Sequence, residues 1–299
     1  MNNIKTLIFG AVAMTCLFSC EKPVFDDSEA GDKPTTTTTQ KDEGKTTGNL
    51  IIRVNGNSVM PYEVTRAVED LTTYCSRLNF VIYKDGVKVK GLSQMKGDSG
   101  YGQVAFDLAP GTYKLLVLAH SSYGGNPTVS DPENIHFTNA LSYSDTFYYY
   151  GDIVATGESK THDITLSRAT TMVRFTIFDE LPADLARVSF FYTGGSGVFN
   201  AVTGYGGDVD SRQEKLWDVT GYTAPFSMPC YTFLQQDTGT LNITVTALTA
   251  TNDTIKQRVF EVPVKHHKMT IVEGNFFDHG NSFTIKGETD WEESETITY

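Results

Sequence analysis

The chain has 299 residues and is acidic, with 36 Asp and Glu residues against 24 Lys and Arg residues and a formal net charge of −12 at pH 7. This balance argues against nucleic acid as a partner, because clustered cations are needed to displace counterions from phosphate backbones. Anionic headgroups repel the same sign, so surface charge would not hold the protein on a membrane. The length is enough for two ordinary domains.

Residues 1–19 have the pattern of a secretory signal: a short polar start with Lys5, an apolar run, and small residues before a cysteine. The run is too short to span a bilayer, which takes about 20 apolar residues. Leu17, Ser19 and Cys20 match the bacterial lipobox. We therefore predict that residues 1–19 are removed and that Cys20 is acylated, because a cysteine with several acyl chains stays in a bilayer. An ordinary thiol at Cys20 and a buried strand are the alternatives.

Residues 20–48 follow as a predicted lipidated N-terminus and flexible tether. From residue 28 to residue 48 large apolar side chains are absent, and a threonine run occupies 35–39. Such a segment cannot bury enough surface to offset its ordering entropy. The acidic cluster of Asp26, Asp27 and Glu29 is similar to the signal that sends lipoproteins of Bacteroidota to the cell surface. A solvated patch in the tether is the alternative.

From residue 49 onward the hydrophobic period is two, which is typical of β-strands with one buried face. Asp85 and Gly86 separate two such runs and predict a hairpin turn. Frequent turns and short strands favour an all-β sandwich architecture. A short helix is predicted over 67–76. A fresh apolar alternation after Ser167 places a domain boundary there, giving β-sandwich domains over 49–167 and 168–299. Strands are expected at 50–54, 80–83, 87–89, 103–108, 113–119, 147–150, 163–166, 171–177, 188–192, 241–247, 255–264 and 282–286.

Few residues point to catalysis or to a cofactor. Asp208, Asp210 and Glu214 lack the glycine and the spacing of a calcium loop, and the adjacent pair His266 and His267 reads as a turn before a strand at 269. We predict no enzyme activity, no metal and no cofactor. A hydrolase is an alternative, although no local motif singles out a pair of carboxylates.

Two cysteines and two tryptophans leave alternatives open. Cys75 and Cys230 could form a disulfide, since an exported protein meets an oxidising compartment, or could be two small buried side chains. Trp217 and Trp291 could stack on sugars, which would fit a surface glycan-binding lipoprotein, or could belong to the core or its rim.

Several segments, in shared order after the lipobox, resemble the fimbrial anchor lipoproteins of Bacteroidota, the FimB-like branch of the fimbrillin superfamily. They are residues 108–113, 147–152, 166–175, 199–204 and 269–276. The resemblance implies two tandem transthyretin-like β-sandwich domains. It also implies an outer-membrane, surface-exposed protein at the base of a fimbrium, where it would terminate assembly and anchor the filament. Its partners would be fimbrial subunits, which bind by strand addition at an open sheet edge.

Arg66 is a candidate protease site that the resemblance raises. Stalk fimbrillins are cut after an arginine near the start of the first domain, and Thr65, Arg66 and Ala67 could form such a site. Cleavage there would release an anchor from its lipid. We therefore favour an exposed, uncut arginine; a cut Arg66 would make the chain a stalk or tip subunit.

Overall fold

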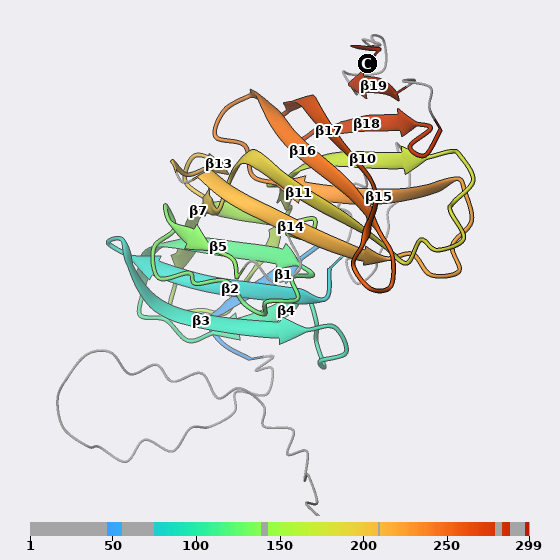
Figure 1. Cartoon of the computed structure of the whole chain (residues 1–299). Coiled ribbons are helices and arrows are strands. Elements are labelled where there is room, and N and C mark those ends of the chain that lie inside the picture. The colour runs from blue at the N-terminus through green and yellow to red at the C-terminus, as the bar shows by residue number, and fades with distance from the viewer. Residues whose placement is uncertain are drawn as a thin grey trace, which may run out of the picture. The chain divides into compact units, whose positions relative to one another are not determined.

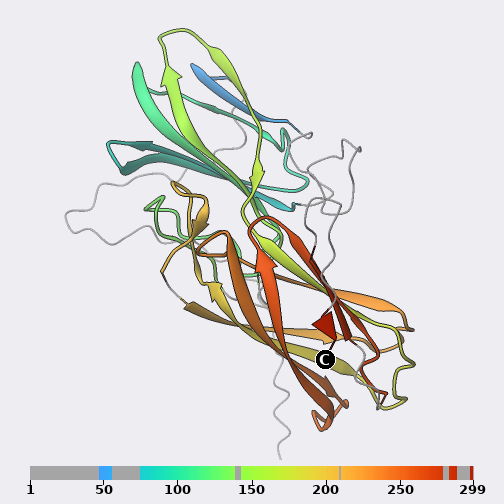
Figure 2. The same ribbon diagram turned by 90° about the horizontal axis from the view of Figure 1, so that it is seen from above.

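The computed structural model describes residues 47–55, 75–138, 143–208, 210–278, 283–287 and 297–298. Within these ranges every regular element is a β-strand (Figure 1, Figure 2). The same residues contain no helix long and apolar enough to cross a membrane. The predicted all-β fold is confirmed.

The N-terminal sandwich consists of two sheets around one buried cluster. One sheet has the order β4 (Gln103–Phe106), β1 (Leu50–Val54) and β8 (Lys160–Ile164). The other has the order β3 (Val87–Met95), β2 (Arg77–Lys84), β5 (Gly111–His120), β7 (Phe147–Ala155) and β9 (Ser167–Arg168). Ile52, Phe80, Val117 and Ile164 come from both sheets and share one core. The two sheets therefore pack face to face.

The C-terminal sandwich has the same two-layer construction. Its five-stranded sheet has the order β15 (Phe226–Thr232), β10 (Thr171–Ile177), β18 (Met269–Gly274), β19 (Phe283–Gly287) and β20 (Ile297–Thr298). Its four-stranded sheet has the order β14 (Asp210–Asp218), β11 (Arg187–Ser196), β16 (Thr238–Leu248) and β17 (Thr254–Lys265). Phe175 of β10 lies at the centre, with its ring centroid 5.2–5.4 Å from those of Phe190, Phe260 and Phe283.

Local sequence explains the clearest elements. In β16 the side chains of Leu241, Ile243 and Val245 are buried while the residues between them are not, as the period of two predicts. Burying each such side chain contributes roughly 1.5–3 kcal/mol. Asp85 and Gly86 both have positive φ, 51° and 80°. That is the requirement of a type I′ turn, and the predicted hairpin of β2 and β3 is confirmed.

The sequence pattern does not predict β14 or β15. The inward positions of β14 carry Gln213, Lys215 and Trp217, so the strand has no aliphatic alternation. Strand β15 contains Pro229, which lacks an N–H and is tolerated only at a sheet edge. Both strands lie at the ends of their sheets, where such residues fit.

Some predictions fall outside the described residues. These are the signal over 1–19, nearly all of the tether over 20–48, and the helix over 67–76 apart from Cys75 and Ser76, which are not helical. The division into domains 49–167 and 168–299 stays a prediction. Residues 42–299 form one compact unit, and β9 pairs with β7 of the N-terminal sandwich.

Candidate functional site

Strand β1 occupies the middle of its sheet. It pairs antiparallel with β4, where Leu50 faces Phe106, and parallel with β8, where Leu50 faces Lys160. Leu50 and Ile52 are fully buried, and Val54 is 7% exposed. Arg53 of the same strand points outward, and its Nη1 lies 3.7 Å from Asp163 Oδ1. Because β1 has a partner on each side, its removal would leave β4 and β8 without their shared neighbour.

The segment just before β1 is fastened to the sandwich. Asn49 Nδ2 donates to the carbonyl of Leu108 at 2.6 Å and to that of Thr156 at 3.0 Å, while its Oδ1 accepts from the Leu108 N–H at 2.9 Å. Ser159 Oγ donates to the Gly48 carbonyl at 2.8 Å. A Cβ at Gly48 would come within 2.7 Å of the Phe106 carbonyl oxygen, so the close approach requires glycine. Any pull on the N-terminal segment is therefore transmitted to β1 and its neighbours.

A small shared sheet joins the two sandwiches. Strand β6 (Ile135–His136) pairs with β12 (Val198–Asn200), which pairs in turn with β13 (Tyr205–Gly206). An aromatic cluster lies beside it: the ring of Phe199 is 4.8 Å from that of Tyr148 and 5.2 Å from that of Phe233. Backbone pairing and burial together connect residues from both halves of the chain.

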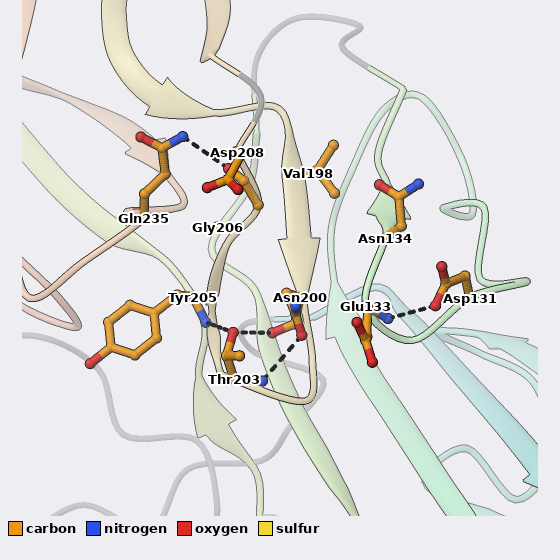
Figure 3. Close-up of a pocket in the computed structure, with 11 residues that line it drawn as sticks. Asp131, Glu133, Asn134, Val198, Asn200, Thr203, Tyr205, Gly206, Asp208 and Gln235 are labelled. Carbon is orange, nitrogen blue, oxygen red and sulfur yellow. Dashed lines mark hydrogen bonds between the residues drawn. The ribbon is translucent and has the colours of Figure 1, made fainter. Parts of the chain in front are cut away.

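A polar pocket opens beside this shared sheet (Figure 3). Its volume is about 550 Å³, and it lies between the loop that carries Asp131, Glu133 and Asn134 and the β12–β13 hairpin. The described residues that line it include no Lys or Arg. A ligand here would therefore have to be neutral or cationic. The full lining is Asp131, Glu133, Asn134, Val198, Asn200, Thr203, Tyr205, Gly206, Gly207, Asp208 and Gln235.

Hydrogen bonds hold part of the pocket wall in place. Asn200 Oδ1 accepts from the N–H groups of Val202 and Thr203 at 2.9 and 3.1 Å. Gln235 Nε2 donates to the Gly207 carbonyl at 3.0 Å. The ring of Tyr205 is not available to stack on a ligand in the pocket, because it is already stacked on His266 with ring centroids 4.2 Å apart. The pocket can form hydrogen bonds with a ligand but has no open aromatic face.

The two residues predicted as sites, Cys20 for lipidation and Arg66 for proteolysis, lie outside the described residues. The disulfide that the sequence left open is absent: Cys75 and Cys230 are free thiols, each buried in the core of a different sandwich. Burial raises the pKa of Cys230 to about 12, with a smaller opposite effect from Lys215, and burial also raises the pKa of Cys75. Both are inert thiols at neutral pH.

The other sequence candidates are separated in the fold. His266 and His267 form the turn between β17 and β18, as predicted. Within the described ranges no three His, Cys, Asp or Glu side chains gather closely enough for a metal ion. Trp217 is half-buried against the C-terminal core, and Lys215 Nζ lies 4.3 Å from its ring centroid. An open face for sugar stacking is therefore not present at Trp217; Trp291 lies outside the described residues.

Sequence reasoning missed the pocket and the shared sheet. Strands β6, β12 and β13 are too short for a periodic signal. Their pairing joins residues about sixty positions apart, for example Val198 with His136. The segment 199–204, which carried part of the family resemblance, does fall in this hairpin. That overlap was the one signal that pointed to the region.

Comparisons with known proteins give a family and a fold. Residues 39–298 match the model of a family of unknown function, DUF6562. No curated protein matches the chain. A candidate polysaccharide-binding protein (DUF1812) from Bacteroides thetaiotaomicron VPI-5482 is 10% identical with a TM-score of 0.51, over 80% of this chain and 95% of that chain. At this identity the likeness shows a shared β-sandwich fold.

Other similar structures come from fimbrial and adhesin proteins. The fimbrial anchor protein Mfa2 from Porphyromonas gingivalis is 11% identical with a TM-score of 0.45, covering 83% of this chain and 98% of that chain. A candidate adhesin from Bacteroides ovatus ATCC 8483 is 15% identical with a TM-score of 0.48, covering 77% and 88%. The structural neighbours thus include a fimbrial anchor protein and a candidate adhesin of Bacteroidota.

Proposed function

The chain belongs to DUF6562, a family of unknown function, and from this premise we propose that it is a lipid-anchored, non-enzymatic protein that holds a fimbria at the cell surface. The lipobox at Cys20 would supply the anchor in the outer membrane. The residues that follow would act as a tether with the folded body facing outward. The fimbrial neighbours are consistent with this role, but the proposal does not rest on them.

The observation that carries the proposal is the position of β1. Cys20 and β1 both precede Arg66 in the chain, so an uncut chain links the lipid directly to the centre of a sheet. The contacts of Asn49 and Gly48 fasten that link on the sandwich side. A pull along the tether would have to break the β1 pairing on both sides at once. This is the construction expected of a protein that bears load.

We further propose that fimbrial subunits bind by strand addition, in which backbone hydrogen bonds and alternate side chains share the binding. With β1 between β4 and β8, the chain fills that position of its own sheet. It needs no strand from another subunit there. A subunit complete in this way suits the end of a filament, where assembly terminates.

The lipid anchor is tested by Cys20→Ser, with Cys16→Ser as the matched control inside the predicted signal. We expect Cys20→Ser to release both the protein and its fimbriae into the medium, while Cys16→Ser leaves them attached. Electron microscopy of cells and intact-mass analysis of the mature protein are the readouts. A mature N-terminus beyond residue 20 without acyl groups would contradict the proposal, as would attached fimbriae in Cys20→Ser cells.

Arg66→Ala separates an anchor from a stalk or tip subunit. For an uncut anchor, the variant should assemble and attach fimbriae as the wild type does, and the mature wild-type chain should still contain residues on both sides of Arg66. Blocked assembly in Arg66→Ala, with wild-type protein that begins at Ala67, would instead indicate a processed stalk or tip subunit.

A second candidate function is glycan binding at the polar pocket, favoured by its uncharged and acidic hydrogen-bonding lining. A neutral glycan array is the test. Binding that is lost in Asn134→Ala and Asp208→Asn, and kept in the exposed control Glu158→Gln, would support it. Trp217→Ala should leave such binding unchanged, because Trp217 does not line the pocket.

A further inference from the structure

Strands β14 and β15 each end a sheet of the C-terminal sandwich, and β11, the partner of β14, connects the two sheets just after β15. Within the part of the chain that the structure describes, β14 pairs only with β11, and β15 only with β10. At Ser196, β11 pairs with Asp210 of β14 and also forms a bridge with Phe233, just after β15. We call the region between residues 211–217 and 228–232 the β14–β15 seam.

The inward side of β14 is polar. Gln213, Lys215 and Trp217 share one face of the strand, since they are two residues apart. Gln213 is 1% exposed, whereas Lys215 and Trp217 are half-buried. The seam is thus closed at Gln213 and reaches solvent beside Lys215, while the indole Nε1 of the half-buried Trp217 is itself buried. The other strands of the four-stranded sheet place Val188, Phe190, Ile243 and Val245 at their inward positions.

Several polar atoms in the seam have no hydrogen-bond partner among the described residues. They are Gln213 Oε1, Trp217 Nε1 and Thr232 Oγ1. Thr232 is 1% exposed, like Gln213. A buried polar atom left unpaired is costly, so most are paired in folded proteins. Their concentration in one seam distinguishes it from the rest of the sandwich.

Lys215 is a cation without an acidic partner. Within the described residues no carboxylate oxygen lies within 4.0 Å of its Nζ, which instead lies over the Trp217 ring. Burial lowers the pKa of Lys215, so the ammonium is poorly solvated. The Lys215 ammonium therefore lies at the mouth of the seam beside the Trp217 indole, whose N–H is itself buried and has no acceptor among the described residues.

We propose that the β14–β15 seam binds a carboxylate carried by an extended segment of another polypeptide, with Lys215 Nζ as its donor and the Trp217 indole directly beside it. A carboxylate accepts several hydrogen bonds, and pairing with a cation strengthens them. A polypeptide fits better than a sugar because Lys215 covers the indole face on which a sugar would stack. Among the described residues, positions 213–217 of β14 pair with β11 alone and contain no proline, so an extended segment can add backbone hydrogen bonds at their other edge.

The test uses the indole N–H signal of Trp217 in the full mature chain labelled with ¹⁵N-tryptophan. The sequence has two tryptophans, so Trp291→Phe assigns the two signals. The probes are an end-blocked peptide, Thr-Val-Thr-Val-Glu-Val-Thr-Val-Thr, and its twin with Gln for Glu. We expect the Glu peptide to shift the Trp217 signal at a concentration at least about ten times lower than the Gln peptide, as one charge-assisted pair allows.

Variants show whether Lys215 carries the effect. Lys215→Met should abolish the preference for the Glu peptide, Lys215→Arg should retain it, and the exposed control Lys88→Met should leave it unchanged. An equal response to both peptides, no response to either, or wild-type preference in Lys215→Met would overturn the proposal. A Lys215-dependent shift with oligoglucuronate and none with the peptides would assign the site to acidic sugars and also overturn it. None of these readouts depends on lipid attachment or fimbriae.

Discussion

Strands β1 and β14 show two different ways to complete a sandwich. Strand β1 lies between two neighbours and buries Leu50, Ile52 and Val54. Strand β14 lies at an edge and turns Gln213, Lys215 and Trp217 inward. The first closes its sheet with apolar side chains and paired backbone. The second leaves donors and acceptors without partners. The difference separates a part of the molecule built for cohesion from a part that is left able to bind.

Buried polar groups also differ in how completely they are paired. In the N-terminal sandwich, His120 is fully buried, yet its Nε2 lies 2.8 Å from Asn79 Oδ1 and its Nδ1 accepts from the Ser122 N–H at 3.2 Å. In the seam, Gln213 Oε1 and Thr232 Oγ1 have no such partners among the described residues. Both sandwiches contain buried polar atoms without a partner among the described residues, since Ser122 Oγ and His162 Nε2 of the N-terminal sandwich also lack one. The contrast is that the His120 ring is paired on both nitrogens, whereas Gln213 Oε1, Trp217 Nε1 and Thr232 Oγ1 gather unpaired in one seam.

The largest effect is expected for Ile52→Asp in β1. A carboxylate at this fully buried position would have no partner, and the free energy of unfolding should fall by about 4–5 kcal/mol or more. Urea unfolding of the non-acylated mature chain measures it. The matched control is Arg53→Ala, whose half-exposed ion pair with Asp163 contributes at most about 1 kcal/mol. Similar losses in both variants would mean that β1 is not part of the folded core.

A pH effect of intermediate size is expected from His120. Burial lowers its pKa from 6.5 to about 3, with a smaller contribution from Arg77. Between these values the unfolded chain binds a proton and the folded chain does not, so stability is full above about pH 6.5 and falls as the pH is lowered. The slope approaches 1.4 kcal/mol per pH unit for one group. Unfolding at pH 7 and pH 4.5 should show a weaker dependence in His120→Gln. The exposed control His136→Gln should keep the wild-type slope; an unchanged slope in His120→Gln would contradict the assignment.

A smaller loss is expected for Gly195→Ala beside the seam. The added Cβ would lie 1.7 Å from Thr232 Oγ1, so the backbone or Thr232 must move. Overpacking of this kind costs about 1–3 kcal/mol. Gly157→Ala is the control, because nothing lies within 4 Å of its added Cβ. Thr232→Ala in the Gly195→Ala background should recover part of the loss; no recovery would place the strain elsewhere.

The smallest effect has the opposite sign. Gln213→Leu removes the unpaired Oε1 from a buried position, together with the hydrogen bond that Nε2 donates to Ser211 Oγ at 2.9 Å. Because the lost bond offsets part of the gain, the free energy of unfolding should rise by less than about 1 kcal/mol. The exposed residue Gln257, whose Nε2 donates to Thr246 Oγ1 at 2.9 Å, supplies the control Gln257→Leu, for which no gain is expected. A clear loss of stability in Gln213→Leu would show that the seam is already satisfied without a partner.

Local sequence was sufficient wherever one strand buries one face. The alternation of Leu241, Ile243 and Val245 and the Asp85–Gly86 turn predicted β16 and the β2–β3 hairpin, because side-chain direction and turn geometry depend on neighbouring residues. The all-β class followed from many such runs. The signal was absent for β14, where the inward residues are polar, and for β15, where Pro229 interrupts the run.

By itself, then, the sequence determined the all-β class, most of the strands with an aliphatic face and the hairpin, and it supplied the lipobox on which the anchor proposal rests. Tertiary structure alone decided that β1 inserts in parallel beside β8, about 110 positions later in the chain, and that β6 pairs with β12 across the two halves. It also decided that the polar side chains of β14 face a seam. Period-two patterns record which side of a strand is buried. They carry no record of the distant segment that covers it, because that choice depends on packing between whole sheets.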